Sequence, residues 1–251
     1  MSDYGLIVKN LSEEIQIDSI YRNLSLSQSG ASETISNNWN ELDPAAGDYW
    51  TRIALTSSAL PPLVLLRPDT DNFVAVMAFV QSGSNYVNVD IITEYDNGPT
   101  TIDWQCYRQN LSGSGINYGI LVYNSAGALC FDSGLQYFKI HSIHSISLDT
   151  PPVLPGALPT PSYGDYEDIS HAGISNPYYI LSPGSQWMHA TTGEPPYVPS
   201  TAMLWKIGVK KLTSTSVRVG WFAYLFDQSD SIADTVNAGY NPTMKLIVCE
   251  P

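Results

Sequence analysis

Few residues in this chain have the types and spacing that chemistry needs. His141 and His144 are the only two histidines that lie close together in the sequence. On a strand, residues three apart point to opposite faces, so this pair is poorly placed to share one metal ion. Asp69, Asp71 and Asn72 resemble half of a calcium loop, but the glycine and the distal glutamate of a complete loop are missing. We therefore expect no metal site, and a surface turn at the two aspartates.

One segment, Tyr163-Gly-Asp-Tyr-Glu-Asp168, places acids beside aromatic rings. A glycosidase needs two carboxylates across a sugar, and Asp165, Glu167 and Asp168 are the candidates for them. A solvated loop is the commoner setting for such a cluster. The chain also lacks a serine-nucleophile motif, a phosphate-binding glycine loop and a cysteine–histidine nucleophile pattern. The sequence therefore favours a protein that is not an enzyme and uses no cofactor.

Aromatic residues in this segment and in two others form the candidate binding surface. An exposed ring can stack on a sugar or pack against a partner chain. The candidates for binding a partner or receptor are Tyr163, Tyr166, Trp187, Tyr197 and Tyr240.

Composition limits the classes of partner. The formal net charge is −13, from 24 acidic against 11 basic residues, and such a surface repels phosphate backbones and anionic membranes. The longest apolar run, Ala59 to Leu66, contains two prolines and is too short to cross a bilayer. The first residues lack a secretory leader pattern. We expect neither nucleic-acid binding nor membrane insertion, and synthesis in a cytoplasm.

The cysteines have no pattern of their own. Cys106, Cys130 and Cys249 form neither a Cys-x-x-Cys motif nor a zinc spacing. An odd and sparse set argues against a disulfide framework, so we expect free, buried thiols.

The strongest organising feature is an internal duplication. Residues 4–19 match residues 118–133 at an offset of 114 without a gap, with identical Tyr, Gly, Val, Asn, Asp and Ser positions. Residues 62–68 match residues 177–183 at an offset of 115, with prolines at both ends. Two ordered blocks are harder to attribute to chance than one.

Weaker blocks extend the match towards the end of the chain. They pair 86–89 with 216–219, and Cys106 with Cys249. The blocks divide the chain into a first domain at 1–108, a linker at 109–117, and a second domain at 118–251 with longer loops. The linker has the Gly/Ser composition of a flexible tether. The extra residues of the second domain lie in three segments, 149–168, 186–200 and 228–241.

Alternating apolar residues predict that both domains are built from strands. Residues 120–123 and 128–132 flank Asn124-Ser-Ala-Gly127, which predicts a β-hairpin, and Asp132 is expected to bond nearby backbone N–H groups. Val217, Val219 and Trp221 alternate as a half-buried strand does. No window of a dozen residues has a capped helical period. We predict an all-β fold of two tandem β-sandwich-like, jelly-roll-like domains related by internal duplication.

The hairpin pattern Tyr-Gly-x-x-Val-x-Asn-x-x-Gly-x-x-x-x-Asp-Ser is complete in residues 118–133 and lacks only the turn glycine in the first copy. It resembles a pattern of small proteins from tailed-bacteriophage tail and baseplate modules. The resemblance covers the hairpins only. It implies a structural virion protein of the tail tip, baseplate or fibre attachment region, in contact with other tail or baseplate proteins. A charged fraction of only 14% and sixteen tyrosines suit a surface that other subunits cover.

Two functions are therefore expected. The first is a structural tail component that assembles as a homo-oligomer through β-rich contacts. The second is a module that binds a host cell-surface receptor or glycan through the long loops of the second domain. A depolymerising hydrolase is the least supported reading.

Overall fold

The computed structural model describes residues 7–9, 15–18, 24–36, 49–69, 72–94, 99–109, 112–116, 118–148, 165–181, 186–191, 200–229 and 243–251. For residues 7–9, 15–18, 35–36, 186–191, 200–205, 223–229 and 243 it describes the backbone alone.

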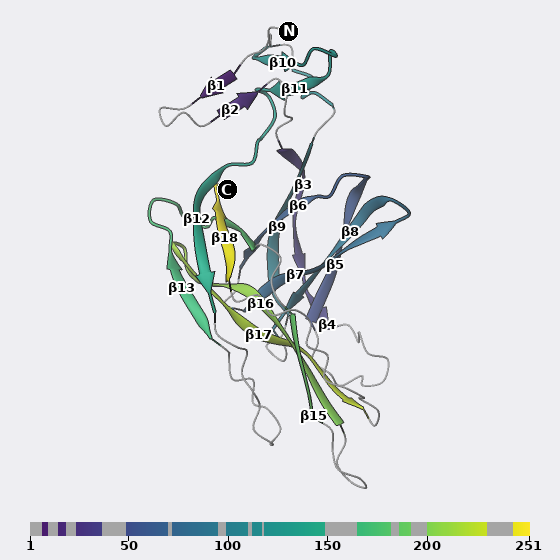
Figure 1. Cartoon of the computed structure of the whole chain (residues 1–251), viewed down its shortest axis with the longest axis vertical. Coiled ribbons are helices and arrows are strands. Elements are labelled where there is room, and N and C mark those ends of the chain that lie inside the picture. The colour runs from purple at the N-terminus through teal and green to yellow at the C-terminus, as the bar shows by residue number, and fades with distance from the viewer. Residues whose placement is uncertain are drawn as a thin grey trace.

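The fold is all-β, as predicted, and every strand pair is antiparallel (Figure 1). A six-stranded sheet has the order β12 (Ile140–Ser147), β18 (Thr243–Cys249), β14 (Tyr178–Leu181), β6 (Leu63–Pro68), β9 (Thr101–Gln109), β3 (Leu24–Glu33). An eight-stranded sheet has the order β13 (Tyr166–Ser170), β17 (Ser216–Ser229), β16 (Ser200–Thr213), β7 (Val74–Ser82), β8 (Asn85–Thr93), β5 (Tyr49–Ser58), β4 (Ile35–Ser36), with β15 (Gln186–Thr191) also paired to β16. Two hairpins stand apart from the sheets, β1 (Ile7–Lys9) with β2 (Ile15–Asp18), and β10 (Leu121–Tyr123) with β11 (Leu129–Asp132).

The alternation seen in the sequence places one face of each central strand in the core between the two sheets. Val89 and Ile91 of β8 are fully buried there, as are Val217 and Val219 of β17. Two smaller clusters cover the other faces of the sheets. One gathers around Tyr107 on the six-stranded sheet, and the other contains Phe73 and Phe222 on the eight-stranded sheet.

The strand order of each sheet is symmetric about its centre. We call the strands up to β9 the first half and the strands from β10 onward the second half. Matched in chain order, β3, β6 and β9 of the first half correspond to β12, β14 and β18 of the second. The six-stranded sheet therefore has the same strand order from either edge. In the other sheet β5, β8 and β7 correspond in the same way to β13, β17 and β16. The halves meet edge to edge at β6–β14 and β7–β16, and they share one core. The two predicted units are thus two halves of one sandwich.

The pairing within the hairpins repeats at the offset found in the sequence. Ile7 is opposite Asp18 in the first hairpin and Leu121 is opposite Asp132 in the second, and both hairpins have their irregularity at the same step. The match of Cys106 with Cys249 is wrong by one position. Leu63 of β6 pairs with Tyr107, whereas the equivalent Tyr178 of β14 pairs with Cys249, so Tyr107 is the counterpart of Cys249.

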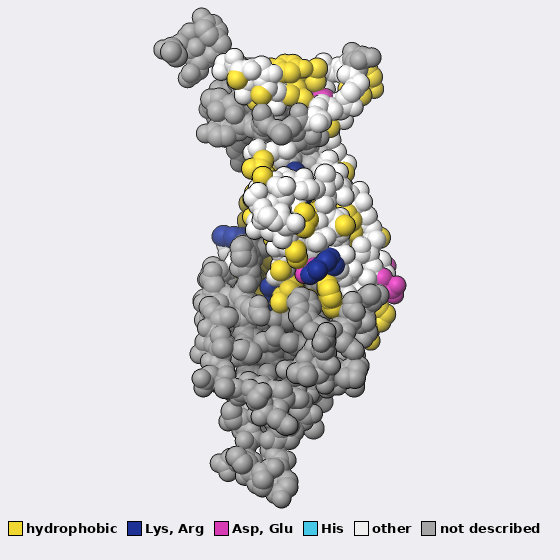
Figure 2. Space-filling model, turned by 90° about the vertical axis from the view of Figure 1, so that its right-hand side faces the viewer, with side chains coloured by type: hydrophobic (Ala, Val, Ile, Leu, Met, Phe, Trp, Pro, Cys, Tyr) yellow, Lys and Arg dark blue, Asp and Glu magenta, His cyan; other side chains and the backbone are white. Residues whose placement is uncertain are grey.

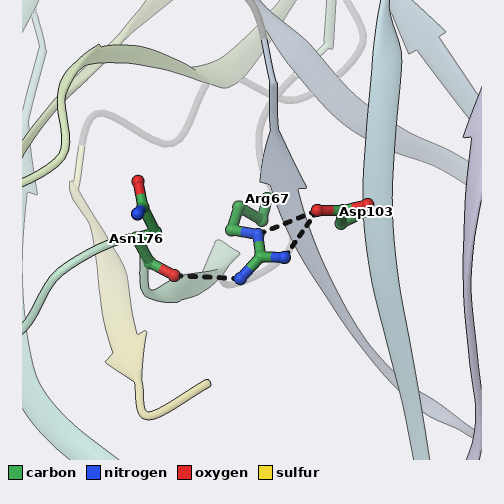
Figure 3. Close-up of polar contacts among 3 residues, drawn as sticks. All are labelled: Arg67, Asp103 and Asn176. Atoms are coloured by element: carbon green, nitrogen blue, oxygen red, sulfur yellow. Dashed lines mark hydrogen bonds and ion pairs between the residues drawn. The ribbon is translucent and has the colours of Figure 1, made fainter.

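Arg67 of β6 makes side-chain contacts to both halves in the six-stranded sheet (Figure 3). Its Nε and Nη2 donate to Asp103 Oδ2 of β9 at 3.1 and 2.5 Å, and its Nη1 donates to the carbonyl of Asn176 at 3.2 Å. The guanidinium also lies 4.5 Å from the ring centre of Tyr178. One side chain therefore ties strands of the first half to the start of β14 in the second.

One prediction about the connecting segments needs correction. The predicted loop 186–200 begins as strand β15, whose backbone pairs with β16 from Gln186 to Thr191. The predicted flexible linker starts inside β9 at Gln109, and its Ser114 is bonded to Asp132 of the second hairpin at 2.6 Å. The segments 149–164, 192–199 and 230–242 lie outside the described residues.

Candidate assembly surface

The turn of the second hairpin follows from its sequence. The Asn124 side-chain oxygen accepts the N–H groups of Ala126 and Ala128 at 3.0 and 2.8 Å, and Gly127 adopts a φ of 74°. A side chain that bonds its own turn and a glycine in the left-handed region are the two devices such a turn needs. The predicted hairpin is confirmed.

Asp132 holds the base of this hairpin. It is 1% exposed, and its two carboxylate oxygens accept the N–H groups of Ser114 at 2.6 Å and Gly134 at 2.8 Å. These backbone hydrogen bonds lower the pKa of Asp132. Its own N–H donates to the hydroxyl of Tyr137 at 2.6 Å, and that ring stacks on Phe131. The expectation that Asp132 bonds nearby backbone is confirmed.

The Tyr-Gly and Asp-Ser ends of the pattern meet in space. The Ser133 hydroxyl accepts the N–H of Ile120 at 2.8 Å, and a Cβ on Gly119 would lie 2.3 Å from that hydroxyl oxygen. Gly119 also has a φ of 113°. Only glycine fits this close approach, so these residues of the pattern build the hairpin.

The outer surface of the hairpin is apolar. Val122 and Cys130 face inward, whereas Tyr118, Leu121 and Tyr123 are 82%, 45% and 52% exposed. Ile120 is also exposed, and Figure 2 shows hydrophobic side chains gathered at this end of the molecule. Exposed apolar groups concentrated in one place mark interaction surfaces in soluble proteins. We call Tyr118, Ile120, Leu121 and Tyr123 the hairpin surface.

The sequence around the hairpin surface has no charged residues. No Asp, Glu, Lys or Arg lies between Arg108 and Asp132. The first hairpin lies beside the second at one end of the molecule, with β2 against β11 (Figure 1). Sequence reasoning found the hairpin but missed this surface, although the uncharged run was the available signal.

The five predicted binding residues do not converge in the part that the structure describes. Tyr166 is on β13, at one edge of the eight-stranded sheet, and is 48% exposed. Trp187 is on β15, opposite Trp205 of β16, so β17 and β16 separate it from Tyr166. Tyr163, Tyr197 and Tyr240 lie outside the described residues.

The acidic cluster near Tyr166 is a strand and not a solvated loop, which corrects the prediction. Residues 166–170 pair with β17. Asp168 binds Arg218 through both oxygens at 2.7 and 2.8 Å, and this contact lowers the pKa of Asp168. The Arg218 guanidinium lies 3.7 Å from the ring centre of Tyr166. Glu167 points to the opposite face of the strand from Asp168, so these two carboxylates do not flank a common site.

The three histidines whose side chains are described make local contacts. His141 bonds the carbonyl of Ala172 at 3.2 Å, and His144 bonds the Ser142 hydroxyl at 2.9 Å. Buried His171 bonds the Tyr179 hydroxyl at 2.8 Å, and burial lowers its pKa. Within the described residues, no group of three or more His, Cys, Asp or Glu side chains could hold a metal ion.

The remaining candidate residues are the three cysteines and the two aspartates that follow β6. Cys106, Cys130 and Cys249 are free and buried, as predicted. Asp69 is exposed in the turn after β6, where its N–H donates to the carbonyl of Thr101 at 3.0 Å, and Asp71 lies outside the described residues.

Comparisons with protein families, with curated proteins and with solved structures find no match to the chain. The described residues include no helix long and apolar enough to cross a membrane.

Proposed function

We propose that this chain is a non-catalytic structural protein of a tailed-bacteriophage particle, in the tail tip, baseplate or fibre attachment region. It associates with copies of itself and with other tail or baseplate proteins. The observation that carries the proposal is the exposed, uncharged hairpin surface at one end of the sandwich. The phage assignment rests on the resemblance of the hairpin pattern.

A second copy of this chain is the first partner that the surface fits. Two chains that each carry a net charge of −13 repel each other over most approaches. The stretch between Arg108 and Asp132 adds no like charge to a contact. Burial of Tyr118, Leu121 and Tyr123 between copies would supply aromatic and aliphatic contacts of the kind that interface cores use.

Mass measurement in solution tests the association. The triple variant Tyr118→Ser/Leu121→Ser/Tyr123→Ser should shift the wild-type oligomer to a monomer in size-exclusion chromatography with light scattering. A matched triple variant, Leu60→Ser/Ile143→Ser/Leu212→Ser, removes other exposed apolar side chains and should leave the oligomer intact. A monomeric wild type at assembly concentrations would refute the self-association.

Labelling of particles tests the location. Antibodies against the chain should bind purified phage particles at the tail end in immunogold micrographs. Particles that lack the chain altogether would refute the virion assignment, whatever its state in solution.

A receptor- or glycan-binding function is the second candidate, and exposed Tyr166 favours it. Arg218 covers one side of the ring, and the ring, Arg218 and Asp168 form a polar and aromatic patch at a sheet edge. Tyr166→Ala should reduce binding of the protein to host cells about tenfold, and Tyr123→Ala, which removes a similarly exposed ring, should not. Equal cell binding by both variants and the wild type would refute this role.

A further inference from the structure

Few backbone residues pair between the two halves where their central strands meet. In the six-stranded sheet β6 and β14 pair at Leu66 and Tyr179, and in the eight-stranded sheet β7 and β16 pair at Val74 and Val209. Among the described residues, no further ladder partners join these strands beyond the two pairs. We call this region the seam.

A cavity of about 530 Å³ occupies the seam. Its walls come from all four central strands, with Val64, Leu66, Val76, Leu181, Ile207 and Val209 among the apolar lining residues. Small-molecule sites measure about 300–1,000 Å³ and are mostly apolar, with a few polar groups that fix the ligand. The seam cavity has both the size and the lining of such a site.

Lys206 is the one charged residue among the described lining residues. It is 9% exposed, and no described residue forms a hydrogen bond or ion pair with its ammonium group. Burial lowers the pKa of this amine. An ammonium group largely removed from water without an anionic partner is costly, and an anion in the cavity would lower that cost.

We propose that the seam cavity binds a small amphiphile with one anionic group on an aliphatic body, of the fatty-acid class, with the anion at Lys206. The lining is mainly aliphatic, which suits a hydrocarbon chain, and the described lining residues offer no second charged group for a polyanion. A neutral lipid would leave the ammonium without a partner. This assignment is independent of the hairpin surface and of the proposed phage function.

Titration of the full chain with dodecanoate, below its micelle concentration, tests the proposal by calorimetry. The wild type should bind one dodecanoate per chain and should bind dodecan-1-ol about tenfold more weakly, because the alcohol lacks the charge. Lys206→Met should bind dodecanoate about tenfold more weakly than the wild type. Lys211→Met removes a lysine on the same strand that does not line the cavity and should bind as the wild type does.

Two further results keep the test decisive. Lys206→Met should melt no lower than the wild type, because methionine fills similar volume without a buried charge. Ala78→Phe places a ring in the lining and should abolish binding of both ligands. A wild type that shows no saturable binding overturns the proposal, including the case in which other segments of the chain fill the cavity. Equal affinity for the acid and the alcohol, or an unchanged Lys206→Met variant, also overturns it.

Discussion

At the scale of single residues, Asp132 joins two parts of the chain that sequence reasoning treated separately. Its carboxylate accepts the N–H of Ser114 from the connecting segment and that of Gly134 from the end of its own hairpin. The ionised carboxylate of Asp132 therefore helps to orient the hairpin surface. Gly119 adds a steric requirement at the same place, since any Cβ there would collide with Ser133.

The protonation of Asp132 should control this hairpin. Its pKa is lowered in the folded chain, so its stabilising effect is complete above the ordinary value of about 3.9 and is lost as the pH falls through the lowered value. Amide exchange at Ser114 and Gly134, followed by NMR from pH 6 downward, should accelerate beyond the global rate as the carboxylate protonates.

The variant Asp132→Asn is the matched control, because it keeps the shape and removes the charge. One of its side-chain positions becomes a donor that faces an N–H group. The two amides should then exchange faster at pH 6 and respond little to acid. Acid-sensitive exchange that persists in this variant would assign the effect to another group.

At the scale of elements, the strands were largely predictable and their partners were not. Turn chemistry and alternation are local, so the hairpin around Asn124 and the buried faces around Val89 and Val219 could be predicted from adjacent residues. The pairing of Leu66 with Tyr179 joins positions far apart in the chain. No local pattern specifies which edge of one half meets the other.

Arg67 is the side chain whose loss should loosen the seam. Arg67→Met removes the Asp103 pair, the bond to the Asn176 carbonyl and the stacking on Tyr178. Because these groups are partly exposed, we expect a loss of about 1 kcal/mol in the free energy of unfolding. Amide exchange at Tyr179 should accelerate beyond the global change.

Arg218→Met is the control for this prediction. It removes a comparable Arg–Asp pair with aromatic stacking, but β13 and β17 belong to the same half. Urea unfolding should show a similar loss, while exchange at Tyr179 follows only the global change. Equal local acceleration in both variants would show that Arg67 has no special role at the seam.

At the scale of the molecule, the two halves depend on each other. Where the halves meet edge to edge, β6 of the first half pairs with β14 of the second, and β7 of the first half pairs with β16 of the second. The main core takes residues from both halves, such as Val89 and Val219. The sequence divides the chain into two units but does not say whether they pack together, because apolar faces in a sequence do not reveal which surface covers them.

Separation of the halves should expose these edges. The fragments 1–116 and 117–251, produced alone, should aggregate or remain unfolded, since unpaired edges and a divided core are both unfavourable. When they are refolded together they should form a one-to-one complex with the circular dichroism of the intact chain. A monomeric, cooperatively folding 1–116 fragment would contradict the shared core.

The hairpin surface could be predicted from adjacent residues, whereas the cavity at Lys206 depends on contacts between distant parts of the chain. The lack of charge between Arg108 and Asp132 is visible in the sequence and marks the hairpin surface. Lys206 gives no such signal, because lysines are usually exposed, whereas the fold leaves this one 9% exposed in a cavity lined by both halves. Of the five aromatic residues proposed from the sequence, Tyr166 alone has a described and exposed side chain.

The two hairpins at one end of the molecule also have a consequence for stoichiometry. Because their backbone registers agree at an offset of 114 residues, from 7 to 121 and from 18 to 132, each chain carries the same hairpin backbone twice. A closed ring of such chains would carry twice as many hairpins as it has subunits. A neighbouring ring that bound these hairpins could then have either the same number of subunits or twice that number.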